Sequence, residues 1–213
     1  TGNALQRGPN HNVSISQLAG ALMQGDVHVS SSGFNSVAKF DATATPTEAS
    51  LPVAGFNVDG SFRVLSNRAG DLQTAGYGAQ VTVTLGGKNG TLHIGGDLQV
   101  DAVGEFSRAD VQFLFANGAV SPTFDSSIDG NVHVLADGVG SRAALRFTAA
   151  MPVTINGGLV VEAKGIDAFA NFSGGNVASI VGDVSVIAGE PSMVSGAYAS
   201  AFIAQISRSR SGH

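Results

Sequence analysis

The sequence predicts an all-β protein, a parallel β-helix (β-solenoid) of about six three-stranded coils. Three observations predict this fold. One seven-residue motif occurs six times, apolar and polar residues alternate over short segments, and Gly or Pro interrupts nearly every window of helical length. Alternation with a period of two residues is typical of strands, and a repeat of 25 to 36 residues suits one coil of a solenoid.

The repeated motif places a glycine and a small polar residue between apolar positions. Its copies are MQGDVHV (23–29), VDGSFRV (58–64), IGGDLQV (94–100), IDGNVHV (128–134), INGGLVV (155–161) and IVGDVSV (180–186). Glycine suits a corner between strands because it accepts a positive φ and lets a neighbouring coil approach closely. The expected structural corner glycines are Gly25, Gly60, Gly96, Gly130, Gly157 and Gly182.

The apolar positions of the motif are expected to stack on the same positions of the next coil, about 4.8 Å away, and to fill the interior. The expected inner ladder is Val29, Val64, Val100, Val134, Val161 and Val186. Parallel inner rows begin at Val27 and at Met23. The large apolar residues of the second strand are expected to form one more row, made of Phe40, Val83, Phe113, Phe147 and Phe172.

The repeat boundaries divide the chain into three parts. Residues 1–22 are expected to form an N-terminal cap or an irregular first coil, residues 23–206 the solenoid, and residues 207–213 a polar tail. Extra residues in the longer repeats are expected to be insertions at corners, in 43–52, 68–78, 86–90 and 117–125. The polar residue after most corner glycines is of a type that bonds its own backbone two residues on in turns.

An antiparallel β-sandwich is the alternative fold, because many short strands joined by turns also build sandwiches. Sandwiches, however, seldom repeat one corner motif six times at near-constant spacing. The repeat therefore favours the solenoid.

Composition excludes several classes of partner and chemistry. The net charge is −5 and only 13% of the residues are charged, which argues against a nucleic-acid partner. The absence of cysteine excludes disulfides, thiolate zinc sites and cysteine nucleophiles. No run of about 18 apolar residues is present, so no transmembrane segment is expected.

Acidic residues are the first candidates for chemistry, because glycosidases use two carboxylates about 5 to 9.5 Å apart. The nearest such collection is Asp97, Asp101, Glu105, Asp125 and Asp129. Most of these lie at predicted turns, where Asp has a local structural role, and no Asp-Asp or DxD pair accompanies them. We therefore expect no catalytic residue, and the chain is not expected to be an enzyme.

Histidines are the candidates for metal binding. His28 and His133 occupy equivalent outward positions three coils apart, which is about 14 Å at the strand spacing. Zinc ligands lie about 2 Å from the ion. These histidines therefore cannot share a metal within one chain, and we expect no metal ligand and no cofactor.

The runs PVTINGGLVVEAKG (152–165) and TLHIGGDLQVDAVG (91–104) resemble the β-helical repeats of large bacterial exoproteins. These include filamentous-haemagglutinin-like adhesins and giant surface proteins with β-strand repeats. The resemblance rests on a structural pattern over about residues 23–204 and transfers no active site. It implies a stalk or fibre shaft, located outside a bacterial cell or on its surface. The chain lacks a recognisable secretion domain and the GGxGxD nonapeptide of calcium-binding repeats.

The expected function is therefore structural or adhesive. The chain would be a subunit or shaft segment of an extracellular surface fibre and would form a homo-oligomer or filament through its coil ends, with contacts to a cell surface or glycan. The alternative is a carbohydrate-binding or carbohydrate-cleaving β-helix module. Such a module needs an aromatic-lined groove, which a chain with no Trp and two Tyr supplies poorly.

Overall fold

The computed structural model describes residues 4–7, 12–16, 22–33, 35–44, 56–67, 78–88, 92–116, 126–147, 153–174, 177–189 and 196–203. Every strand pair in these segments is parallel, and no helix occurs in them. The predicted all-β parallel solenoid is therefore confirmed. The alternative, an antiparallel sandwich, is wrong.

Three parallel sheets make up the solenoid. Sheet A contains, in spatial order, β1 (Ala4–Arg7), β4 (Val27–Ser32), β7 (Phe62–Asn67), β10 (Leu98–Val103), β13 (Val132–Asp137), β16 (Leu159–Ala163) and β19 (Val184–Ala188). Sheet B contains β2 (Asn12–Ser16), β5 (Val37–Ala44), β8 (Gln80–Lys88), β11 (Arg108–Ala116), β14 (Arg142–Phe147), β17 (Phe169–Gly174) and β20 (Tyr198–Ile203). Sheet C contains β3 (Leu22–Met23), β6 (Phe56–Val58), β9 (Leu92–Ile94), β12 (Ser126–Ile128), β15 (Val153–Ile155) and β18 (Val177–Ile180).

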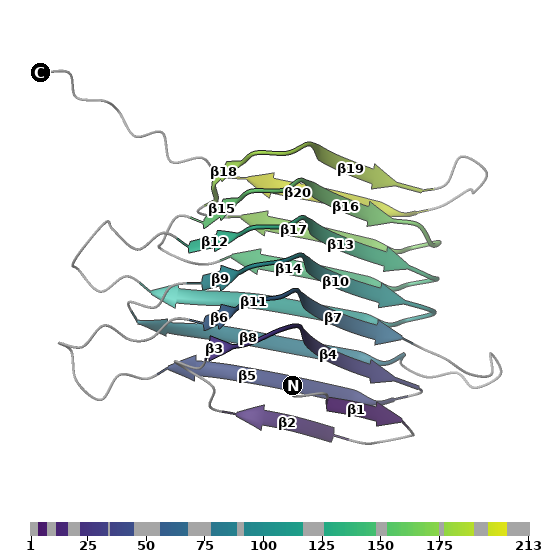
Figure 1. Cartoon of the computed structure of the whole chain (residues 1–213). Helices are drawn as coiled ribbons and strands as arrows, with labels where there is room; N and C mark the ends of the chain where they lie inside the picture. The colour runs from purple at the N-terminus through teal and green to yellow at the C-terminus, as the bar shows by residue number, and fades with distance from the viewer. Residues whose placement is uncertain are drawn as a thin grey trace, which may run out of the picture.

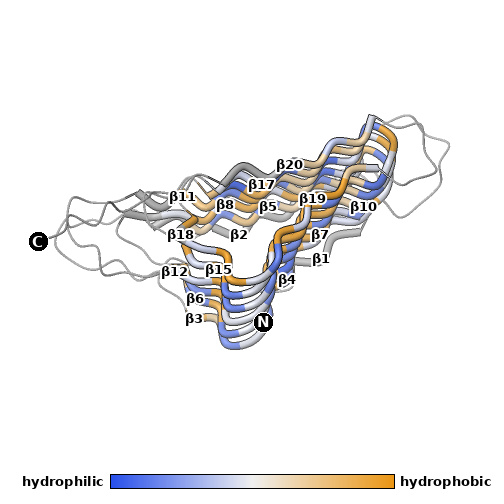
Figure 2. Tube along the Cα trace, turned by 90° about the horizontal axis from the view of Figure 1, so that it is seen from above, coloured by the Kyte–Doolittle hydropathy of each residue, from blue (hydrophilic) through white to orange (hydrophobic). Residues whose placement is uncertain are grey.

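Each coil takes one strand from sheet C, then one from sheet A and one from sheet B, and the coils stack along one axis (Figure 1). Viewed along that axis, the sheets form three sides of the cross-section, and the corner between sheets C and A points away from sheet B (Figure 2). We call this corner the glycine corner, because it holds the repeated glycine. The corner between sheets A and B is called the serine corner.

The N-terminal residues extend the stack. β1 pairs with β4, and β2 pairs with β5, so both strands continue sheets A and B beyond the first three-stranded coil. Most residues of the predicted insertions, and the polar tail 207–213, lie outside the described residues. Of the insertion 86–90, residues 86–88 belong to the end of β8.

The interior is filled by in-register apolar rows. Val29, Val64, Val100, Val134, Val161 and Val186 lie opposite one another on successive strands of sheet A. The first five of these valines are buried. A ladder of like residues buries each coil against its neighbours, which one coil cannot achieve alone.

The predicted single row of second-strand apolar residues is wrong, because they belong to two adjacent rows. Phe40 lies opposite Val83, whereas Phe113 and Phe147 lie opposite each other one row further along the strands. Their rings stack with centroids 4.9 Å apart. Both rows point inward, since a shift of two residues preserves the face of a strand. Alternation alone therefore could not separate them.

The glycine corner depends on close backbone approach. A Cβ on Gly157 would lie 2.4 Å from the carbonyl oxygen of Gly130 and 2.5 Å from its carbonyl carbon. The Gly157 N–H donates to that oxygen at 3.1 Å, and equivalent bonds join Gly96, Gly130 and Gly182 to the coil before each of them. Of the six corner glycines, Gly25 alone has a positive φ, of 95°.

The polar residues after the corner glycines bond across coils. The Asp26 Oδ1 accepts the Ser61 N–H at 2.8 Å, and the Asp97 Oδ1 accepts the Asn131 N–H at 2.7 Å. The Asn131 Oδ1 in turn accepts a hydrogen bond from the Gly158 N–H of the next coil, at 2.9 Å. In the structure these side chains therefore bridge neighbouring coils, whereas the sequence suggested a bond to the residue's own backbone.

The serine corner is held by buried hydroxyls. Ser36, Ser107 and Ser141 are buried. The Ser107 Oγ donates to the Val103 carbonyl at 2.7 Å, and the Ser141 Oγ donates to the Gly138 carbonyl at 2.9 Å. These bonds close the turn from sheet A to sheet B and fix the residues that precede β11 and β14.

Candidate functional site

The acidic residues singled out in the sequence do not converge. Asp97 lies at the glycine corner, Asp101 on the outer face of sheet A, and Glu105 at the serine corner. Asp129 follows β12, on the sheet C side of the glycine corner, and Asp125 lies outside the described residues. The four described acids are therefore distributed over the glycine corner, the outer face of sheet A and the serine corner.

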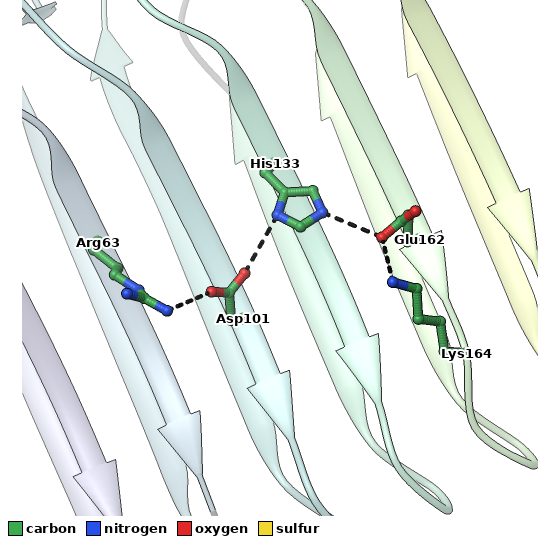
Figure 3. Close-up of polar contacts among 5 residues, drawn as sticks. All are labelled: Arg63, Asp101, His133, Glu162 and Lys164. Carbon is green, nitrogen blue, oxygen red and sulfur yellow. Dashed lines mark hydrogen bonds and ion pairs between the residues drawn. The ribbon is translucent and has the colours of Figure 1, made fainter.

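A different group of charged side chains comes together on the outer face of sheet A (Figure 3). Arg63 Nη2 lies 3.3 Å from Asp101 Oδ2, and Asp101 Oδ1 lies 3.7 Å from His133 Nδ1. His133 Nε2 lies 3.4 Å from Glu162 Oε2, which also lies 3.0 Å from Lys164 Nζ. We call these five residues the charged ladder. It links four successive coils.

The ladder arises from contacts between neighbouring rows of the sheet. Arg63, Gln99 and His133 share one outward row, whereas Asp101 lies two residues further along its strand, opposite Leu135. Diagonal neighbours in a sheet lie within reach of long side chains. A comparison of equivalent positions alone does not reveal these pairs, because Asp101 pairs with residues of a neighbouring row.

The pKa values of the two carboxylates of the ladder, Asp101 and Glu162, are shifted in opposite directions. Burial raises the pKa of Asp101 above its ordinary value, and the charges of His133 and Arg63 offset part of that rise. Burial also raises the pKa of Glu162, but the hydrogen bonds and charges of Lys164 and His133 together bring it below its ordinary value. The ladder can therefore hold one carboxylate firmly ionised beside another that takes up a proton more readily.

The histidines lie as their spacing predicted. His28 heads the outward row that continues through Arg63 and Gln99 to His133. Burial, and then the charge of Arg63, lower the pKa of His28. Within the described segments, no cluster of three or more His, Cys, Asp or Glu could hold a metal ion.

The C-terminal end of the stack exposes residues at positions that are buried in β4, β7, β10, β13 and β16. Val184 and Val186 occupy the inner positions of β19, yet they are 49% and 46% exposed. The residues opposite them in β16, Leu159 and Val161, are fully buried. We call the surface formed by Val181, Val184, Val186 and the last strands β18, β19 and β20 the end surface. It combines uncovered apolar side chains with strand edges that are last in their sheets.

Comparison with protein families, with characterised proteins and with solved structures found no significant match. Among the described residues, no helix is long and apolar enough to cross a membrane.

Proposed function

We propose that the chain is a structural, non-enzymatic unit of an extracellular bacterial fibre that assembles end to end along the solenoid axis. The observation that carries this proposal is the end surface, where inner-row valines are half exposed. Exposed apolar patches next to unpaired strand edges favour association. The surface location and the adhesive role rest on the resemblance of the repeats to adhesin shafts.

The occupant of the end surface is a second copy of this chain. β19 and β20 are the last strands of sheets A and B, and β1 and β2 are the first strands of the same sheets, at the opposite end of the stack (Figure 1). Because all strands within a sheet run parallel, a second copy on the same axis would continue the pairing from β19 to its β1 and from β20 to its β2. Head-to-tail contacts of this type do not close and so propagate into a filament.

Substitution of Val186 by Asp tests the assembly. Val186 is half exposed in a single copy, so Val186→Asp should fold with a nearly unchanged far-ultraviolet circular dichroism spectrum. In the assembly, the carboxylate would be buried without a partner, which is strongly unfavourable. We expect the wild-type chain to form oligomers whose mass grows with concentration in light scattering, and Val186→Asp to stay monomeric.

Ser185→Asp is the matched control, because Ser185 lies on the same strand and points to the opposite face of sheet A. It adds the same charge but should assemble like the wild-type chain. A wild-type chain that remains monomeric at high concentration, without fibres by electron microscopy, would contradict the proposal. Equal assembly of Val186→Asp and Ser185→Asp would contradict it as well.

A further inference from the structure

A cleft of about 440 Å³ opens on the outer side of the serine corner. Its walls include Gln80, Phe106, Arg108, Arg142 and Asp167, which come from four successive coils. Ligand sites typically have volumes of about 300–1,000 Å³ and combine apolar walls with a few polar groups. The cleft has the size and the mixed lining of a small-molecule site.

An exposed aromatic ring forms one wall. Phe106 has a φ of 54°, a conformation that bulky residues rarely adopt, and is 50% exposed. The equivalent residue of the next coil is Gly140, where a Cβ would lie 2.7 Å from Phe106 Cδ1. The ring therefore lies across the space that the glycine leaves free. Asn35, Gly140 and Asp167 occupy the same position of the serine corner in other coils and also have a positive φ. This backbone conformation is therefore a property of the corner, and the exposed ring is what distinguishes Phe106.

Two arginines line the cleft side by side. Arg108 and Arg142 lie directly opposite each other on adjacent strands, and Gln80 lies opposite Arg108 on its other side. Like charges in this position repel each other unless a partner offsets one of them. Arg108 has such a partner, because its Nε bonds the Asp110 carboxylate on the same strand.

Arg142 is the uncompensated cation of the cleft. Its side chain is exposed, and no carboxylate of the described residues lies within ion-pair distance of it. A guanidinium binds a carboxylate through two parallel hydrogen bonds. Asp167 and Gln80 provide oxygens that accept hydrogen bonds from hydroxyl groups. The cleft thus offers one site for a single negative charge, acceptors for hydroxyls and one apolar wall.

We propose that this cleft binds an acidic sugar, a pyranose that carries one carboxylate. The carboxylate pairs with Arg142, the apolar face of the ring lies on Phe106, and the hydroxyls donate to Asp167, which lies on the coil after that of Arg142. The carboxylate of Asp167 in the same cleft disfavours a second negative charge, such as a sulfate group, on the same sugar ring. Because the cleft lies on a corner of the solenoid and the end surface on its last coil, this binding is independent of end-to-end assembly.

Calorimetric titration with trigalacturonate tests the proposal, with the fully methyl-esterified trisaccharide as the neutral counterpart and sodium sulfate as a free anion. We expect trigalacturonate to bind and the methyl ester to bind at least about tenfold more weakly, which corresponds to the loss of one charge-assisted contact. Sulfate should not compete at equal concentration. Absence of trigalacturonate binding at millimolar concentration, equal affinity for the ester, or equal binding of sulfate would overturn the proposal.

Two variants locate the site. Arg142→Gln should weaken trigalacturonate binding about tenfold or more. Arg146→Gln should leave it unchanged, because Arg146 is an exposed arginine of the same strand that lies outside the cleft lining. Phe106→Asn removes the ring while keeping a residue that tolerates positive φ, and it should weaken binding of the acid and the ester alike. Equal losses in Arg142→Gln and Arg146→Gln would show general attraction by positive charge and refute the site.

Discussion

At the scale of single residues, Asp101 is an acid placed between two apolar neighbours in its row. It lies between Leu65 and Leu135 in register and is only 5% exposed. Its Oδ2 is paired with Arg63, but its buried Oδ1 has no hydrogen-bond partner, since His133 Nδ1 is 3.7 Å away. The ionised form is thus poorly solvated, which agrees with the raised pKa of this carboxyl.

Replacing Asp101 by Asn should reveal this raised pKa through the pH dependence of stability. A group whose pKa is higher in the folded state binds its proton more tightly there, so protonation stabilises the wild-type fold as pH falls through the folded pKa. Asn cannot take up that proton. The stability of the variant relative to wild type should therefore be highest at pH 7 and should fall as the pH decreases through the raised pKa of Asp101 in the folded state. Urea unfolding at several pH values measures this difference.

Arg63→Gln is the companion variant to Asp101→Asn. Arg63 lowers the pKa of Asp101, so its removal should move the transition in the stability difference to higher pH. A difference between Asp101→Asn and wild type that is independent of pH would contradict the assignment.

At the scale of strands and corners, the motif predicted well which residues share one row of sheet A, but it did not predict which residues of different rows contact each other. Equivalent positions of sheet A were predictable because a repeated glycine fixes the phase of each copy. The second strand carries no such marker, so its register could be shifted by two residues without changing the inward face. The charged ladder joins neighbouring rows, and the cleft joins a corner to a strand start. Neither feature can be predicted from the residues of a single row.

Glycine substitutions separate the two physical reasons for a corner glycine. Gly157→Ala would place a Cβ against the backbone of Gly130 and should cost at least about 2 kcal/mol of unfolding free energy, since backbone cannot move aside cheaply. Gly25→Ala meets nothing within 4 Å but has a positive φ, so it should cost about 1–2 kcal/mol. Denaturant midpoints of both variants measure the costs. A larger loss at Gly25 than at Gly157 would show that dihedral strain, rather than close approach, dominates the corner.

At the scale of the whole molecule, stability is distributed as in other repeat arrays, where each coil interacts mainly with its neighbours. An interior coil is covered on both sides, whereas the last coil is covered on one. Residues of the same type in the same row therefore contribute different amounts to the free energy of unfolding, depending on how far their coil is from the end of the stack. This asymmetry connects the stability of the fold to the proposed assembly.

Val134→Ala and Val186→Ala remove the same two methyl groups from one row, at 0% and 46% exposure. In dilute solution, Val134→Ala should cost about 2–3 kcal/mol through lost burial and a residual cavity, and Val186→Ala less than about 1 kcal/mol. As the protein concentration rises, stacked copies cover Val186, and its substitution should become more costly while the cost of Val134→Ala stays constant. Thermal unfolding of both variants across a hundredfold range of concentration measures this. A cost of Val186→Ala that does not change with concentration would show that the end surface stays uncovered.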